Sequence, residues 1–251
     1  MNIEQFKKNP VFLIHGMWSD ARIMSNIEDK LTARGFTSVI NCTLPFHHDR
    51  NSDLPKLKRA GIRYYTDKIK RKISEYPEKE VSIIGHSMGG LIALLCSGHE
   101  KVTHVAAINP APAKGCFVCN AHVLYSILHN PYYLWCITTG QPIHILPKDI
   151  KELCMNKCTQ SVDDIRGKFY ALPESTKAIK DALFCRMHIP RKVNSRRIVF
   201  SSLADRITPH KGHVKLQNSL GIETVHAREE DHTSLLLRPS IGAILEANLF
   251  C

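Results

Sequence analysis

The chain has 251 residues, of which 43% are hydrophobic, and its 34 Lys and Arg against 23 Asp and Glu give a net charge of +11 at pH 7. A chain of this length can bury a substantial core as one domain. No apolar run approaches the roughly 18 residues that a membrane-spanning helix needs, and the polar N-terminal segment does not resemble a secretory signal. We therefore expect a soluble, cytoplasmic protein of one domain, residues 1–251, with reduced cysteines.

Six short apolar runs, each separated from the next by helical or loop sequence, predict β-strands. They lie at about 10–15, 36–41, 80–85, 101–108, 196–202 and 222–227. Strands that alternate with helices along the chain are typical of parallel sheets, because each crossover helix returns over a face of the sheet. We predict an α/β fold with a mostly parallel, doubly wound sheet of about six strands.

The segment between the second and third of these strands is strongly basic. From Lys56 to Ile73, apolar residues recur at helical spacing, which predicts one amphipathic helix with a basic outer face. A solvated face is the simplest interpretation. No nucleic-acid motif supports a nucleic-acid partner, so we expect none, and weak association with an anionic membrane surface is the alternative left open.

The third predicted strand runs directly into Gly85-His86-Ser87-Met88-Gly89 and then into a helix over 91–97. A Gly-x-Ser-x-Gly turn between strand and helix is typical of a nucleophile elbow, which holds the serine on a strained turn while the glycines let the two elements approach. Ser87 is therefore the candidate nucleophile. A structural turn serine is the competing interpretation.

The first strand ends in His15-Gly16-Met17-Trp18, at the same predicted edge of the sheet as Ser87. The backbone N–H groups of Met17 and Met88 would face each other there and form an oxyanion hole, aided by the helix that begins after Ser87. Gly16, Trp18 and Pro110 are expected to line the substrate pocket.

The fourth strand ends at Asn109-Pro110, and regular structure resumes only near Pro190. The interval between them contains short helical pieces broken by prolines and rich in aromatic residues. We predict a helical cap, about 111–190, inserted into a core formed by 1–110 and 191–251.

Cysteines are frequent in this cap. Cys116-x-x-Cys119 with His122 has a spacing that could ligate zinc, and Cys154 and Cys158 could add a pair. Structural zinc sites are more compact than this, and free cysteine is a common small buried residue. We expect thiols, no metal and no cofactor.

Two further polar residues follow the last two strands. Asp205 lies just past the fifth strand, and His232 lies in the loop after the sixth, so the chain order is Ser, Asp, His. Asp205 as a turn-forming residue and His232 as one of 14 ordinary histidines are the competing interpretations. Asp231 is adjacent to His232, but neighbouring side chains seldom face each other. We therefore take Ser87, Asp205 and His232 as the candidate catalytic set.

The motifs around residues 15–18, 85–90, 205–209 and 232 resemble those of the α/β-hydrolase superfamily, and in particular its capped, esterase- and lipase-like members. The resemblance implies a Ser-His-Asp triad that cleaves a carboxylic ester or related acyl bond, with an apolar small-molecule or lipid ester as substrate. Members of this fold often begin with an antiparallel hairpin, for which the sequence before Pro10 is too short. An acyltransferase, a thioesterase and a ligand receptor remain alternatives, as do monomeric and homodimeric states.

Overall fold

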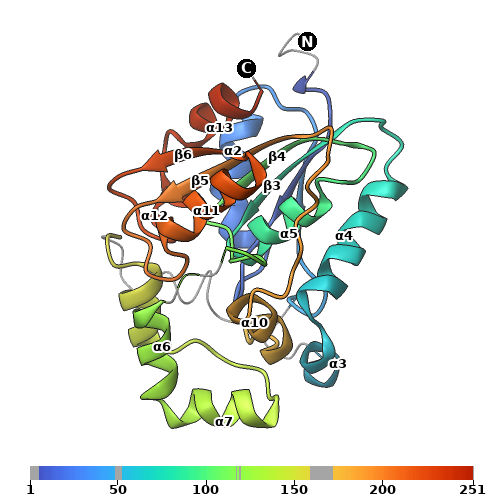
Figure 1. Ribbon diagram of the computed structural model, residues 1–251. Helices are drawn as coiled ribbons and strands as arrows, with labels where there is room; N and C mark the ends of the chain where they lie inside the picture. The colour runs from blue at the N-terminus through green and yellow to red at the C-terminus, as the bar shows by residue number, and fades with distance from the viewer. Residues whose placement is uncertain (1–5, 49–52, 117, 119, 159–171, 251) are drawn as a thin grey trace.

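The structure is a computed structural model that describes residues 6–48, 53–116, 118, 120–158 and 172–250 (Figure 1). Its centre is a six-stranded sheet in which every strand pair is parallel. The strand order is β2-β1-β3-β4-β5-β6. The strands are β1 (Val11–Ile14), β2 (Val39–Cys42), β3 (Val81–His86), β4 (Val102–Ile108), β5 (Arg196–Ser202) and β6 (Glu223–Ala227). The predicted fold class is confirmed.

The second strand begins later than predicted. Phe36 is buried, but its N–H donates to the Leu31 carbonyl, and the N–H of Thr37 donates to the Lys7 carbonyl. Phe36 therefore closes the turn that ends the preceding helix, where Gly35 has a φ of +90°, and Thr37 is held by the N-terminal segment instead of by a neighbouring strand. The apolar character of Phe36 reflects its packing in the core and not membership of the sheet.

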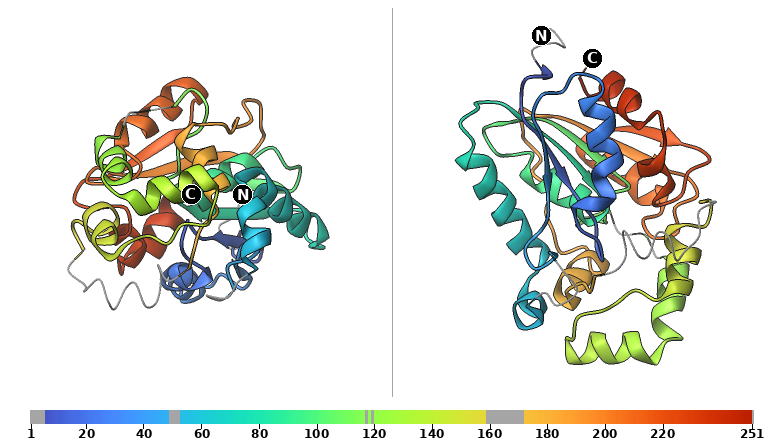
Figure 2. Two further views of the ribbon diagram at one scale, coloured as in Figure 1. Left: turned by 90° about the horizontal axis from the view of Figure 1, so that it is seen from below. Right: turned by 180° about the vertical axis from the view of Figure 1, so that it is seen from behind.

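Helices cover both faces of the sheet (Figure 2). Alternate side chains of β1 point to opposite sides, so that Phe12 packs with the α4–α5 layer and Leu13 with the α2–α13 layer. The helices described are η1 (Ala21–Met24), α2 (Ser25–Thr32), α3 (Leu54–Arg59), α4 (Ile62–Glu75), α5 (Met88–Cys96), α6 (Ala121–Leu128), α7 (Pro131–Thr139), α8 (Pro147–Asp149), η2 (Ile150–Cys154), α10 (Thr176–Leu183), α11 (His210–Leu220), α12 (Ser234–Leu237) and α13 (Ile241–Leu249). None of them is long and apolar enough to cross a bilayer.

The prediction of one continuous helix over the basic segment is wrong. The chain leaves the helix at Ala60, whose ψ is 127°, and starts α4 after an extended Gly61. Ser175 donates a hydrogen bond to the Ala60 carbonyl, and the N–H of Ile62 donates to Asp181 at 3.2 Å. Contacts from a segment more than a hundred residues away therefore break a helix that the local spacing favours.

Helices α6, α7, α8, η2 and α10 lie between β4 and β5 in the chain and gather at one end of the molecule (Figure 1). They fall in the interval for which the sequence predicts a cap; the division of the chain into core and cap stays a prediction. Trp18 joins them to the core, since its indole N–H donates to the Ile143 carbonyl at 2.9 Å.

A buried ion pair makes a second junction between this end and the sheet. The two nitrogens of His47 lie 3.0 Å from the Pro45 carbonyl and 3.1 Å from Glu174 Oε2. Both partners are acceptors, so both nitrogens carry hydrogen and the ring is an imidazolium. Burial opposes this charge, but the Glu174 carboxylate and the Pro45 carbonyl raise the pKa of His47 above its usual value. Tyr65 and the N–H of Ser175 donate to the other oxygen of Glu174.

This pair predicts a specific pH dependence of stability. Because the pKa of His47 is raised in the folded state, its contribution is complete below about pH 6.5, the unfolded value, and is lost as pH rises through the folded value. We expect Glu174→Gln to lower the free energy of unfolding by about 3–5 kcal/mol at pH 6 and by less at pH 9. Urea denaturation at the two pH values measures the difference.

The matched control is Glu75→Gln, which removes an exposed ion pair between Arg71 and Glu75. It should change stability by less than about 0.5 kcal/mol at either pH. An equal loss at pH 6 and pH 9 in Glu174→Gln would contradict a charged His47.

Candidate active site

Ser87 occupies the turn between β3 and α5 in a strained conformation, with φ 55° and ψ −119°. Such backbone costs of order 1–3 kcal/mol for a residue with a side chain and persists only where the surroundings hold it. Three backbone hydrogen bonds do so here: the Ser87 N–H donates to Ile108, and its carbonyl accepts from Leu91 and Ala111. The turn needs glycine on both sides, because a Cβ on Gly85 would overlap the Gly89 carbonyl. The predicted strand–turn–helix is therefore present in full.

Asp205 and His232 meet beside this turn. His232 Nδ1 lies 2.7 Å from Asp205 Oδ2, and both side chains are almost completely buried. Burial alone would raise the pKa of Asp205, but the charge and hydrogen bond of His232 and the hydrogen bonds of Thr208 hold it below the usual value. Asp205 is thus a carboxylate, so the Nδ1 of His232 donates to it, and the Nε2 has a free lone pair whenever the imidazole is neutral.

The other oxygen of Asp205 shapes the turn. Oδ1 accepts hydrogen bonds from the N–H groups of Ile207 and Thr208 at 2.7 and 2.8 Å. This is the turn-forming role that the sequence offered as the competing explanation for Asp205. The two interpretations are compatible, because each uses a different oxygen of the same carboxylate.

Asp231, the adjacent acid, is engaged elsewhere. Its Oδ1 accepts from the N–H groups of Thr233 and Ser234, and its Oδ2 accepts from those of Lys157 and Cys158. Four backbone donors leave it no role as a partner of the His232 ring. It ties the loop after β6 to the end of η2.

The hydroxyl of Ser87 makes no hydrogen bond to His232 within the described residues. The two are nevertheless connected through His86, whose Nε2 donates to the His232 carbonyl at 2.8 Å and whose ring lies 4.7 Å from the His232 ring. Contacts between a nucleophile and its base are often long without substrate and tighten when it binds. The missing hydrogen bond between Ser87 and His232 is therefore compatible with a catalytic pair that has no substrate bound.

Two further histidines near Ser87 are neutral. His15 accepts a hydrogen bond from the N–H of Leu44 and donates from Nδ1 to Gly16. Burial lowers the pKa of His15 and of His86 to about 3. Neither carries charge near pH 7. Each ring holds backbone in place: His15 holds Gly16 and Leu44, and His86 holds the carbonyl of His232.

The turn after β1 lies against Ser87. A Cβ on Gly16 would come 2.9 Å from the Ser87 Cβ, which brings the following residue, Met17, to the elbow. Met88 is the first residue of α5, so its N–H belongs to the N-terminal turn of that helix. The positive end of the helix dipole therefore points at the space beside Ser87.

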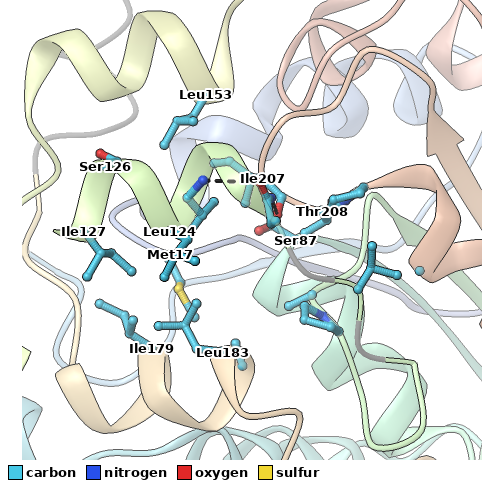
Figure 3. Close-up of a pocket in the computed structure, with 18 of the residues that line it drawn as sticks. Met17, Ser87, Leu124, Ser126, Ile127, Leu153, Ile179, Leu183, Ile207 and Thr208 are labelled. Atoms are coloured by element: carbon cyan, nitrogen blue, oxygen red, sulfur yellow. Dashed lines mark hydrogen bonds between the residues drawn. The ribbon is translucent and has the colours of Figure 1, made fainter. Parts of the chain in front are cut away.

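A cavity of about 440 Å³ extends from Ser87 to helices α6 and α10 (Figure 3). Met17, Leu124, Ile127, Ile179 and Leu183 point into it from the core, α6 and α10. That this cavity is the substrate pocket stays a prediction; Trp18 and Pro110 line it. Gly16 does not, because its Cα faces the elbow. The lining is overwhelmingly apolar, and its one acid, Asp149, is bound by Tyr133 and Ser126.

Sequence reasoning missed Asn109, which connects three parts of the site. Its amide nitrogen donates to Ser202 and to the carbonyls of Asp231 and His232, and its amide oxygen accepts from the N–H of Ser202. Its φ of 45° is a conformation that asparagine tolerates better than most residues. An asparagine before proline at a strand end was the only signal in the sequence.

The cap cysteines do not form a metal centre in the described part of the chain. Cys119 lies outside the described residues; the side chains of Cys116 and Cys154 are buried, and that of Cys158 is partly buried. Among the residues described, no group of three or more His, Cys, Asp or Glu side chains is arranged so that it could hold a metal ion. Burial raises the pKa of Cys116, which keeps it protonated. The absence of a metal requirement stays a prediction.

Comparisons with known proteins agree with this architecture. A family model, the alpha/beta hydrolase family, matches residues 11–214, and the chain belongs to that family. No curated protein sequence gives a significant match.

Several solved structures share the fold. A pyrethroid hydrolase from Sphingobium faniae is 15% identical with a TM-score of 0.66, over 96% of this chain and 98% of that one. Polyneuridine aldehyde esterase is 16% identical with a TM-score of 0.67, over 95% and 98%. A tomato methylketone synthase I variant bound to β-ketoheptanoate is 13% identical with a TM-score of 0.71, over 96% and 97%. At these identities the likeness concerns the fold.

Proposed function

We propose that the protein is a serine hydrolase that cleaves carboxylic esters with an apolar acyl group. The observation that carries the proposal is the buried Asp205–His232 hydrogen bond of 2.7 Å next to a strained Ser87 that lines an apolar cavity. Membership of the alpha/beta hydrolase family supports it, as does the presence of an esterase among the similar structures.

In the proposed reaction, the Ser87 hydroxyl attacks the ester carbonyl while His232 Nε2 accepts its proton. Asp205 holds the other ring nitrogen as a donor and stabilises the imidazolium that forms. The N–H groups of Met17 and Met88 stabilise the negative oxygen of the tetrahedral intermediate, and each such donor is typically worth about 3–4 kcal/mol.

Collapse of this intermediate expels the alcohol, which takes the proton from His232, and leaves an acyl ester on Ser87. Water then attacks the acyl group, with His232 again accepting a proton, and releases the acid. Every step uses groups of this chain, so the proposed reaction needs no cofactor.

The strained serine yields the first prediction about activity. Ser87→Ala should fold normally and lose both nitrophenyl ester hydrolysis and covalent labelling by a fluorophosphonate, because the attacking oxygen is gone. Mass spectrometry of the labelled wild type should place the adduct on Ser87. Labelling of equal extent in Ser87→Ala would exclude this residue as the nucleophile.

Matched substitutions can distinguish the roles of the two acids near His232, Asp205 and Asp231. Asp205→Asn should lower kcat by about 10⁴, since an amide favours the wrong tautomer of His232. Asp231→Asn should lower the melting temperature but reduce kcat far less, because Asp231 binds only backbone N–H groups. Steady-state kinetics and thermal denaturation on both variants provide the test. The reverse pattern would make Asp231 the orienting acid.

The shape of the cavity predicts which esters are cleaved. Ile127 lies away from Ser87 across the hollow (Figure 3), so Ile127→Trp should shorten the space for an acyl chain. At about 0.8 kcal/mol per excluded methylene, kcat/KM for an eight-carbon ester should fall roughly 10- to 100-fold while that for acetate is unchanged. Leu128→Trp, on the adjacent exposed residue, is the control. Equal effects on both chain lengths would place the acyl chain elsewhere.

A further inference from the structure

The exposed apolar side chains of this protein are concentrated on the cap. Of the eight exposed large hydrophobic side chains among the described residues, six belong to it. They are Leu124, Tyr125, Leu128, Leu134, Trp135 and Phe184, with exposed fractions between 38% and 64%. We call this set the cap patch. Single exposed apolar residues are ordinary, but five on the packed helices α6 and α7 and a sixth, Phe184, at the cavity that α6 lines point to an interaction surface.

Helix α6 shows how unusual the cap patch is. Its sequence is strongly apolar, yet none of its side chains is buried. A helix that is apolar around its circumference normally lies inside a protein. Here the inward side of α6 lines the cavity through Ile127, while Tyr125 and Leu128 on the helix are 64% and 55% exposed.

The charges around the cap patch are positive. The described part of the cap contains seven Lys and Arg and four Asp and Glu. Three of the four acids, Asp149, Glu174 and Asp181, are buried. The surface of the cap is therefore basic, as is the neighbouring helix α3, which exposes Lys56 and Lys58.

Apolar and basic elements adjoin at this end of the molecule. Gly140, which ends α7, lies so close to Lys58 that a Cβ on it would be 3.6 Å from the lysine side chain. Lys177 of α10 hydrogen-bonds the carbonyl of Arg59 at the end of α3. Figures 1 and 2 show α3, α7 and α10 together at the end of the molecule away from the termini.

We propose that the cap patch and its basic border dock on a lipid bilayer with anionic headgroups. Leu128 and Trp135 would enter the interface, where tryptophan and tyrosine are favoured, and Lys58 and Lys177 would lie over the headgroups. In the sequence, association with an anionic membrane was the alternative interpretation of the basic segment from Lys56 to Ile73, which the structure divides into α3 and α4. Helix α4 buries its apolar positions against the core and offers charge alone, whereas the cap offers charge and apolar area together.

Docking through the cap patch would place the opening of the cavity at the lipid surface. Leu124 and Phe184 line the cavity and are also 47% and 63% exposed, so the cap patch borders the opening. An apolar molecule could pass from the lipid surface toward Ser87 without crossing bulk water. Docking itself does not depend on the proposed esterase reaction, because none of these residues belongs to the catalytic set.

The experiment is flotation of the full chain with vesicles of phosphatidylcholine alone or with about 30% phosphatidylserine, in roughly 0.1 M salt. We expect binding to the anionic vesicles, a blue shift of tryptophan emission that is lost in Trp135→Phe, and weaker binding in high salt. The double variant Leu128→Ser/Trp135→Ser and the double variant Lys58→Glu/Lys177→Glu should each weaken binding about tenfold or more.

Matched controls are Leu203→Ser, an exposed leucine in the loop after β5, and Lys79→Glu, an exposed lysine in the loop before β3. Both should bind as the wild type does, and Ser87→Ala should bind unchanged whatever its activity. Binding to anionic vesicles that survives both double variants would overturn the proposal. So would a dimer in sedimentation velocity that Leu128→Ser/Trp135→Ser dissociates, because a second copy would then cover the cap patch. Absence of vesicle binding by the wild type would also overturn it.

Discussion

The close approach of three backbone segments at the end of the sheet is the constraint on which the rest of the site depends. A Cβ on Gly85 would overlap the Gly89 carbonyl, and one on Gly89 would overlap the carbonyl of Ile14. With these side chains absent, the start of α5 lies against both β3 and β1, and Ser87 is forced into a backbone conformation that only its surroundings stabilise. These two close approaches bring together the strained turn, the N-terminus of α5 and the loop after β1.

The topology of the sheet supplies the remaining groups. Strands β2 and β3 lie on opposite sides of β1, so the chain reverses its direction of winding there and leaves a crevice at the carboxyl ends of β1 and β3. Strands β5 and β6 continue the same parallel order, so the loops after them, with Asp205 and His232, open at the same edge. Asn109, at the end of β4, bonds both the His232 loop and β5 and so keeps these loops in register with the elbow.

The sequence predicted those features of the fold and the site that depend on a few neighbouring residues. The six strands, the elbow and the positions of Asp205 and His232 after strands all follow from short apolar runs and turn chemistry over a few residues. The break at Ala60 did not, because Ser175 and Asp181 cause it from across the molecule. The His47–Glu174 ion pair was equally invisible, since its members are 127 residues apart and neither belongs to a motif. Asp205 was hard to interpret for another reason: its two oxygens serve two purposes, and each alone accounts for an aspartate in that turn.

The surface of the cap follows from how its interior is built. Three acids are used internally: Asp149 binds Tyr133, Glu174 binds His47, and Asp181 binds the N–H of Ile62. With these three carboxylates buried, Glu152 is the one exposed acid among the described residues of this interval, against seven Lys and Arg. Helix α6 lines the cavity through Ile127 and has no buried residue, so among the described residues nothing covers its outward side chains completely. Burial of three acids and the uncovered side of α6 together leave lysines and apolar side chains exposed in the described part of the predicted cap.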